Sequence, residues 1–249
     1  MASAEVSVVI PVHNGARYLP DAIASARGQS IAPIEIVVVD DGSTDDTVVT
    51  ARALGSDIRL IPQPHSGVAA ARNTGTRAAR GSLVAFLDCD DRWTDDKLAT
   101  QVPIMLEHPD IDVVLGHTRR MWLSAGELRL TDPELALHLG AALIRREIFG
   151  RVGAFDEALR RGEDWDWFMR AREQAAAMVV HPEVALLYRR HGGNMSNDAP
   201  ASMGSLVTMI HRSIGRRRSG AGAAAPLPRL PSLEEYLRER AGGEGADPA

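Results

Sequence analysis

The stretch Leu83-Val-Ala-Phe-Leu-Asp88-Cys-Asp90-Asp91 is an apolar run that leads directly into three carboxylates. Five consecutive apolar residues predict a strand buried on both faces, so the carboxylates emerge together at its carboxyl end. Open α/β sheets bind ligands at that edge. Because adjacent carboxylates lose hydration and repel one another there, a cation or hydrogen-bond donors must compensate. Oxygen ligands on a short turn suit Mg²⁺ or Mn²⁺, and the alternative is a solvated acidic turn.

The composition indicates a globular chain with a full core. Of its 249 residues 45% are hydrophobic, and the net charge of -5 argues against nucleic acid as a partner, since phosphate neutralisation needs a basic face. Cys89 is the single cysteine, and the sequence starts without a basic segment followed by an apolar one. No apolar run approaches the roughly 20 residues that cross a bilayer. We therefore expect a cytoplasmic protein, with any membrane contact peripheral and at the inner face.

Strand and helix patterns alternate along the first ninety residues. The predicted elements are strands at 6–12, 34–39, 58–61 and 83–87, with helices at 20–27, from about 46, and at 67–79. This alternation predicts an α/β fold whose mostly parallel central sheet is flanked by helices and connected by right-handed crossovers, with a Rossmann-like N-terminal half.

The periodic signal weakens in the second half of the chain. A helix capped by Thr94 is predicted to run to about His108, and the later elements are a strand at 112–117, a hairpin or irregular segment at 119–130, mixed structure at 135–144, a helix at 165–174, and two strands at 178–181 and 184–188. The arrangement of these elements does not follow from their pattern alone.

The last fifty residues differ in kind. One helical face carries apolar residues and leads into three arginines: Met203, Leu206, Met209, Ile210, Ile214 and then Arg216, Arg217 and Arg218. Such a face packs on its own domain or, alternatively, meets a membrane surface or a partner protein. Residues 220–231 have the composition of a flexible linker, and Ser232-Leu-Glu-Glu235 is a capping box that predicts one short terminal helix.

The carboxyl ends of the parallel strands bring polar residues to one edge of the sheet. The residues expected in this crevice are Pro11, His13, Asn14, Asp40, Asp41, Asp88, Cys89 and Asp90, joined by Arg72. Asp41 can accept from a base N–H, Arg72 can bond a base carbonyl or a phosphate, and Asp88 can bond ribose hydroxyls. The alternatives are a turn cap for Asp41, a solvated helix charge for Arg72 and simple packing for His13.

Two common phosphate-binding signatures are missing from the sequence. No Gly-x-Gly-x-x-Gly follows the first strand, and no Gly-Lys-Ser/Thr loop occurs anywhere. A pyrophosphate bound at this edge must therefore be neutralised differently, and a metal ion at Asp90 is the remaining candidate.

Four segments, in this order and spacing, resemble the inverting family 2 glycosyltransferases with the GT-A fold. They are Val6-Ser-Val-Val-Ile-Pro-Val-His-Asn14, Val37-Val-Val-Asp-Asp-Gly-Ser-Thr-Asp45, Ala70-Ala-Arg-Asn-Thr-Gly75 and Phe86-Leu-Asp-Cys-Asp-Asp91. The resemblance covers roughly residues 6–196. It implies that Asp40 and Asp41 hold the nucleotide base, that Asp88 lies near the ribose, and that Asp90 binds Mn²⁺ or Mg²⁺ on the diphosphate.

The resemblance extends to two later motifs. Asp164 in Gly162-Glu-Asp-Trp165 matches the catalytic base, and His191, in the segment 188–196, matches a histidine that approaches the metal or the diphosphate. A carboxylate at a helix start beside Trp165 and Trp167 suits a base, because the helix dipole keeps it ionised while the rings exclude water and stack on sugar faces. The alternatives are a helix N-cap for Asp164 and a structural role for His191.

These observations predict a metal-dependent transferase that moves a sugar from a nucleoside diphosphate, expected to be a uridine diphosphate sugar, to a hydroxyl acceptor. The acceptor brings a hydroxyl group, as a glycan, a lipid-linked saccharide or a protein would. The corresponding division is a single domain at 1–198, with a nucleotide-sugar-binding half (1–117) and an acceptor and catalytic half (118–198), then a basic amphipathic helix at 199–218 and a flexible tail at 219–249.

Two other functions use a similar pattern. A sugar-phosphate nucleotidyltransferase shares the sheet and the metal carboxylates, but it usually needs a Gly-rich loop and a lysine near the first strand, and neither is present. A non-catalytic scaffold keeps the fold and presents its C-terminal region to a partner. The intact carboxylates Asp90 and Asp164 speak against the scaffold.

Overall fold

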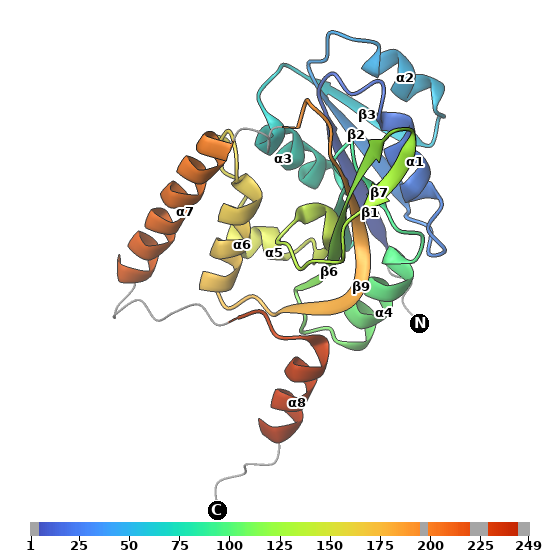
Figure 1. Ribbon diagram of the computed structural model, residues 1–249. Helices are drawn as coiled ribbons and strands as arrows, with labels where there is room; N and C mark the ends of the chain where they lie inside the picture. Colours follow the sequence, from blue (N-terminus) through green and yellow to red (C-terminus); the bar gives the residue numbers. More distant parts are fainter. Residues whose placement is uncertain (1–4, 195–198, 220–228, 244–249) are drawn as a thin grey trace, which may run out of the picture.

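A computed structural model describes residues 5–194, 199–219 and 229–243 (Figure 1). A nine-stranded sheet crosses the molecule in the order β3-β2-β1-β4-β8-β6-β9-β5, and β7 pairs with β6. The strands are β1 (Val6–Val12), β2 (Glu35–Asp41), β3 (Ile58–Gln63), β4 (Leu83–Phe86), β5 (Arg92–Trp93), β6 (Val113–Ser124), β7 (Glu127–Leu130), β8 (Ala142–Arg145) and β9 (Met178–Arg189).

Helices cover both faces of this sheet. They are α1 (Leu19–Arg27), α2 (Thr47–Ala53), α3 (Val68–Ala78), α4 (Lys97–Glu107), α5 (Ile148–Val152), α6 (Glu163–Glu173), α7 (Ala199–Ser219) and α8 (Leu233–Gly243), with a 3₁₀ turn η1 (Leu139–Ala141). The predicted α/β architecture with flanking helices is therefore confirmed.

The sheet is parallel in its first half and mixed in its second. Strands β3, β2, β1 and β4 are all parallel neighbours, as predicted. Beyond β4, the pairs β4–β8, β6–β8 and β5–β9 are antiparallel, whereas β6–β9 is parallel. The mostly parallel prediction thus describes the first four strands, because the short strand β8 introduces a reversal that no periodic pattern marked. The hairpin given as one alternative for 119–130 is present as β6 and β7.

Two local predictions are wrong. The two strands expected at 178–181 and 184–188 form one continuous strand, β9, whose pairing with β6 shifts register around His117. Pro182 lacks a ladder N–H, so the chain bulges there without leaving the sheet. Thr94 does not cap α4: the helix begins at Lys97, and the Thr94 hydroxyl donates to the Val184 carbonyl at 2.6 Å.

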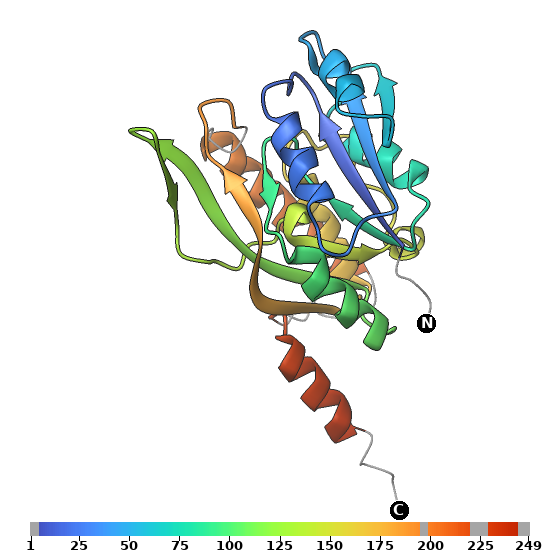
Figure 2. The same ribbon diagram turned by 90° about the vertical axis from the view of Figure 1, so that its right-hand side faces the viewer.

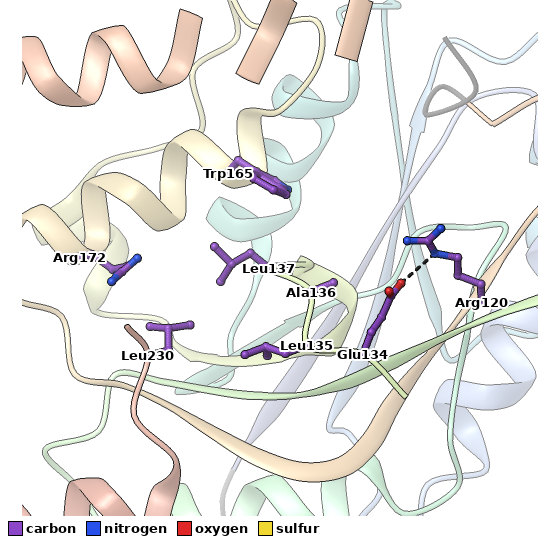
Figure 3. A pocket seen from close by; sticks show the side chains of 8 residues that line it. All are labelled: Arg120, Glu134, Leu135, Ala136, Leu137, Trp165, Arg172 and Leu230. Carbon is purple, nitrogen blue, oxygen red and sulfur yellow. Dashed lines mark hydrogen bonds and ion pairs between the residues drawn. The ribbon is translucent and has the colours of Figure 1, made fainter. Parts of the chain in front are cut away.

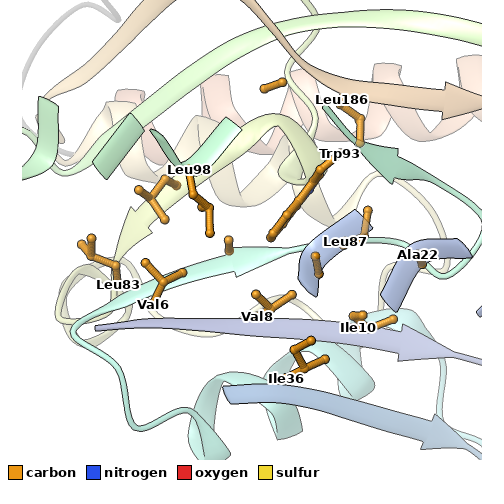
Figure 4. Close-up of a cluster of buried hydrophobic side chains, with 14 of the residues drawn as sticks. Val6, Val8, Ile10, Ala22, Ile36, Leu83, Leu87, Trp93, Leu98 and Leu186 are labelled. Carbon is orange, nitrogen blue, oxygen red and sulfur yellow. The ribbon is translucent and has the colours of Figure 1, made fainter. Parts of the chain in front are cut away.

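Alternate residues of β1 fill two separate core layers. Val6, Val8 and Ile10 face α1 and α4 in a cluster with Trp93 and Leu98 (Figure 4). Val9 points the other way, toward α3 and the layer that contains Phe86 and Trp167. A Cβ on Gly75 of α3 would collide with Val9, so glycine is what allows α3 to pack closely on β1. This close packing sets the position of Arg72 and Asn73.

The C-terminal helices differ in how they contact the body. Helix α7 lies beside α6 (Figure 1), where Met209 and Ser213 are buried and Arg216 pairs with Asp166 and Glu173. Met203 and Leu206, also expected on the apolar face, lie outside the residues whose side chains the structure describes. Of the described helices, none is long and apolar enough to cross a membrane.

Helix α8 projects from the body (Figures 1 and 2) and starts with the predicted capping box. The Ser232 N–H donates to the Glu235 carboxylate at 2.9 Å, and the Glu235 N–H donates to the Ser232 hydroxyl at 3.2 Å. The preceding Pro231 accepts a hydrogen bond from the Val180 N–H at 3.1 Å, which ties this segment to β9. The linker predicted at 220–231 lies largely outside the described residues.

Candidate active site

The loops after β1 and β2 are joined by Asn14. Its side-chain oxygen accepts from the Thr44 N–H at 2.7 Å, and its own N–H donates to the Ser43 hydroxyl at 2.9 Å. His13 lies at the same edge, with Nδ1 2.8 Å from the Asp41 carbonyl oxygen, and its ring stacks on His65 at 4.1 Å. Pro11 is buried in β1 opposite Val39.

Asp40 and Asp41 are both buried at the end of β2, but only Asp41 is extensively hydrogen-bonded. Its carboxylate accepts from Gln63 Nε2 at 2.7 Å and from the N–H groups of Ser66 and Gly67 at 2.9 and 2.8 Å, just before α3. Burial alone would raise the pKa of Asp41, yet these donors outweigh it and lower the pKa. Asp41 is thus ionised and holds the loop before α3 in place. This is the turn-capping role that the sequence analysis gave as the alternative for Asp41.

The buried Arg72 connects the acidic turn after β4 to the start of α6. Its Nη2 donates to the Asp88 carboxylate at 2.7 Å, and its Nη1 donates to Glu163. Burial opposes ionisation of Asp88, but Arg72, with a smaller contribution from His138, lowers the pKa of that carboxyl. The solvated-charge alternative for Arg72 is excluded, since the residue is only 4% exposed.

Asp90 and His191 are far apart in the sequence but lie in contact in the structure. His191 Nε2 lies 2.9 Å from Asp90 Oδ2, and the His191 ring stacks on Tyr18 at 4.7 Å. Burial and the charge of Asp88 raise the pKa of Asp90, and His191 only partly offsets them. An imidazole nitrogen and a carboxylate oxygen at this distance form two ligands of the kind that Mn²⁺ accepts.

Asp91 is one of the three carboxylates expected at this edge, without an individual role, and His138 is a site residue that the sequence analysis missed. One Asp91 oxygen accepts from the Arg189 N–H at 2.8 Å, while Oδ2 is buried and has no hydrogen-bond partner among the described residues. His138 Nε2 lies 4.0 Å from both Asp88 Oδ2 and Asp91 Oδ2, so the three side chains could share an ion. Burial and the neighbouring carboxylates raise the pKa of Asp91 well above its usual range. This surplus of buried negative charge fits a divalent cation.

Cys89 sits between these carboxylates and packs beneath them. Burial, together with the charges of Asp90 and Asp88, raises the pKa of its thiol, so it stays neutral. A Cβ on Gly15 would lie 2.8 Å from its Sγ, which shows how closely the loop after β1 approaches the acidic turn. Cys89 therefore supports this turn through packing.

Asp164 is the second residue of α6 and is partly exposed. Gly162 is the residue before the helix, so Asp164 is not its N-cap, although its Oδ1 accepts the Trp165 N–H at 2.8 Å. Burial raises the pKa of Asp164; Arg72 opposes this rise, and the charge of Asp88 adds to it. Glu163 points inward to Arg72, which leaves Asp164 as the carboxylate at the crevice.

A cavity of about 420 Å³ is bordered by Trp165, the residue that follows Asp164 (Figure 3). Trp165 forms part of its wall with 38% of its surface exposed, beside Leu135 and Leu137 from the loop before η1 and Leu230 from the C-terminal segment. The sequence analysis missed this loop, including His138, because residues 135–144 lack a periodic pattern. The signal that could have indicated His138 as a site residue is its position as a single histidine within an apolar run.

The sequence pattern of the family described as Glycosyl transferase family 2 matches residues 7–155, and that of Glycosyltransferase like family 2 matches residues 134–206. The chain belongs to glycosyl transferase family 2. The first match contains the acidic turn with Asp88 and Asp90, and the second contains Asp164 and His191.

Individual relatives support this membership. An uncharacterized glycosyltransferase of Rickettsia prowazekii is 30% identical over 213 residues, which cover 78% of this chain and 66% of the relative. A PGL/p-HBAD biosynthesis glycosyltransferase of Mycobacterium tuberculosis is 31% identical over 208 residues, which cover 79% of this chain and 81% of the relative. The chain thus spans slightly less than two thirds of the length of the Rickettsia protein.

Two solved structures share the fold of this chain. Residues 1–349 of S. aureus TarS in complex with UDP-GlcNAc have a TM-score of 0.71 at 21% identity, covering 88% of this chain and 68% of that one. The mannosyltransferase PcManGT from Pyrobaculum calidifontis, in complex with GDP-Man and Mn²⁺, has a TM-score of 0.67 at 22% identity, covering 89% and 66%. The predicted GT-A fold is confirmed.

Proposed function

We propose that this chain is a metal-dependent inverting glycosyltransferase that moves a sugar from a nucleoside diphosphate to a hydroxyl acceptor. The observation that carries this proposal is the convergence of three carboxylates on one crevice. On one side Asp90 contacts His191, and on the other Asp164 lies at the start of α6. Arg72 connects the two sides, because it pairs with Asp88 and with Glu163, the neighbour of Asp164. A donor diphosphate at Asp90 and an acceptor hydroxyl at Asp164 would then flank the transferred sugar.

The nucleoside is assigned to the crevice formed by His13, Asn14, Asp40 and Asp41, with Asp88 on the ribose. Asp41 holds the rim of this crevice through Ser66 and Gly67, so the base would meet a preformed edge. A uridine donor is favoured by the UDP-GlcNAc bound to TarS, whereas PcManGT was solved with GDP-Man. The acceptor is a glycan, a lipid-linked saccharide or a protein.

Asp90 and His191 would hold Mn²⁺ or Mg²⁺, with Asp88 and Asp91 adding negative charge nearby. Such an ion supplies Lewis-acid stabilisation of the charge that develops on the leaving diphosphate. Asp164 accepts the proton of the acceptor hydroxyl, which can then attack the anomeric carbon from the face opposite the diphosphate. One displacement of this kind inverts the anomeric configuration. Trp165, which follows Asp164 and is 38% exposed, offers a ring face to a sugar.

Donor hydrolysis tests this proposal. UDP-glucose, UDP-GlcNAc and GDP-mannose are incubated with the full chain with and without Mn²⁺, and release of the nucleoside diphosphate is measured. We expect release from at least one donor that depends on the metal and is lost in Asp90→Asn. Asp95→Asn is the matched control, because Asp95 is exposed and lies just beyond the acidic turn. Metal-independent release, or equal release by Asp90→Asn and wild type, contradicts the proposal.

A further inference from the structure

The cavity bordered by Trp165 has the size of a small-molecule site and mainly apolar walls. Its volume of about 420 Å³ falls in the range of roughly 300 to 1,000 Å³ that ligand pockets occupy. Leu135, Ala136, Leu137, Trp165 and Leu230 supply the apolar surface, and Leu135 is 48% exposed. An apolar ligand surface would be desolvated against these side chains.

The charges around this cavity are not balanced. At one side Arg120 donates to Glu134 at 2.8 Å, so this pair is neutral overall. Arg172 also lines the cavity, and it makes no ion pair or hydrogen bond within the part of the chain that the structure describes. Burial, and the nearby charge of Arg217, lower the pKa of Arg172, and no carboxylate among the described residues pairs with it. A partly buried guanidinium in this position favours an anionic ligand.

Helix α6 fixes the spacing between Arg172 and the candidate base. Trp165 and Arg172 are seven residues apart, which is two helical turns, so both project from the same face into the cavity (Figure 3). With a rise of 1.5 Å per residue their backbones are about 10 Å apart. Asp164 immediately precedes Trp165, so the candidate base is one residue away from the Trp165 end of the cavity, and the Arg172 cation lies two helical turns further along.

We propose that this cavity binds an amphiphilic acceptor, with a hydroxyl group at one end, an apolar body in the middle and a carboxylate or phosphate at the other end. This proposal rests on the proposed function, because it places the acceptor hydroxyl at Asp164. Arg172 binds the anionic group, and Leu135, Leu137 and Leu230 contact the apolar body. Leu230 belongs to a segment held to β9 by Pro231, so the C-terminal segment supplies one wall of the acceptor site.

Calorimetry of two matched probes tests the proposal without requiring turnover. 4-Hydroxycinnamate carries a hydroxyl and a carboxylate at opposite ends of a rigid apolar body, and its methyl ester lacks the charge. We expect the full chain to bind the acid about tenfold or more tightly than the ester. Arg172→Gln should abolish this preference while it leaves the ester's affinity unchanged.

Two further variants separate charge from apolar contact. Leu230→Gln should weaken the acid and the ester by a similar factor. Arg212→Gln should change neither affinity. Arg212 is a surface arginine on α7 that pairs with Asp156 and does not line the cavity. Equal affinities of wild type for acid and ester, a preference that survives in Arg172→Gln, or no binding of either probe at millimolar concentration overturns the proposal. Because donor hydrolysis is measured separately, probe binding without metal-dependent hydrolysis would reject the transferase function and keep the anion-binding cavity.

Discussion

At the scale of single residues, Asp164 separates a transferase from a protein that only binds nucleotide sugars. Asp164→Asn conserves shape and removes the base, so we expect turnover to fall about 10² to 10⁴-fold while donor affinity stays close to wild type. Transfer kinetics and nucleotide titration measure the two effects. Since Gly162 precedes the helix, the loss cannot come from a missing N-cap.

The neighbouring carboxylate provides the comparison for Asp164. Glu163→Gln keeps a hydrogen-bonding group beside Arg72 but removes the charge, so it is expected to weaken the start of α6 rather than to remove the base. Its turnover should exceed that of Asp164→Asn. If Glu163→Gln has the lower turnover, the role of base moves to Glu163. If both variants are fully active, neither carboxylate is the base.

The pH dependence of transfer follows from the same side chain. A general base acts when ionised, so kcat/KM falls as the pH drops through the pKa of the base. Burial raises the pKa of Asp164, and the charge of Asp88 adds to the rise. We therefore expect the acidic limb of the pH profile to lie above the range of an ordinary aspartate. A profile that stays flat down to that range would contradict the assignment.

Lys97 is a buried residue whose effect concerns stability. Its Nζ donates to Gln101 Oε1 at 2.7 Å and to the Ala142 carbonyl at 3.0 Å. Burial lowers the pKa of Lys97 to about 7, against about 10.4 in an unfolded chain. Between these values the unfolded chain binds more protons than the folded one, so the free energy of unfolding rises with pH in this window.

The variant Lys97→Met removes this titration. Urea unfolding at several pH values between 7 and 9 should show a steeper rise in unfolding free energy for wild type than for Lys97→Met. Equal slopes would mean that the folded state keeps Lys97 charged, which its hydrogen bonds and its position 4.5 Å over the Trp93 ring would then explain.

At the scale of elements, α3 holds the two parts of the site together. Arg72 pairs with Asp88 and Glu163, while the adjacent Asn73 donates to the Phe155 carbonyl at 3.0 Å and accepts from the Phe155 N–H at 2.8 Å. A single turn of this helix therefore fixes both the acidic turn and the segment that leads into α6.

Loss of Arg72 should consequently affect stability as well as activity. Arg72→Met leaves the buried Glu163 without its counter-charge, and removal of one partner of a buried ion pair costs about 3 to 5 kcal/mol. Denaturant unfolding measures this loss. Arg77→Met on the same helix is the control, because Arg77 is exposed. Similar stabilities of the two variants would show that the Arg72 pairs contribute little.

The regular elements near the site were predictable because each has a strong local pattern. The apolar runs of β1, β2 and β4 and the Gly67 start of α3 place Asp40, Asp41, Arg72 and Asp88 at one edge. The position of His138 was not predictable, since it depends on β8, the strand that follows η1, inserting between β4 and β6. A long-range strand order of this kind leaves no mark on local periodicity. The same limit applies to Leu230, which reaches the cavity from far along the chain.

At the scale of the whole molecule, α7 packs against α6, and one of the three arginines at its basic end forms ion pairs within the protein. Arg216 pairs with Asp166 and Glu173, so it is not offered to a membrane. A contact of the C-terminal region with an anionic surface remains our prediction, and it would rest on Arg218, which is exposed, with Val207 and Ile210, which are 46% and 41% exposed.

Liposome sedimentation measures this contact. Vesicles with anionic lipid should retain the chain more strongly than neutral vesicles. Arg218→Ala should weaken the binding free energy to anionic vesicles by about 1 kcal/mol, the contribution expected for one basic residue near such a surface. Arg238→Ala is the control, because it removes an arginine that is also exposed but lies on α8. Equal retention on both vesicle types would exclude the membrane role.

The strand order has a consequence for how this enzyme can be recombined with its relatives. Strand β8 from the second half of the chain pairs with β4, while β5 from the first half pairs with β9. A chimera joined near residue 117 would therefore break hydrogen-bonded ladders on both sides of the junction. Under the nucleoside assignment proposed above, donor preference would be transplanted by grafting the loops after β1 and β2, which leaves those ladders intact.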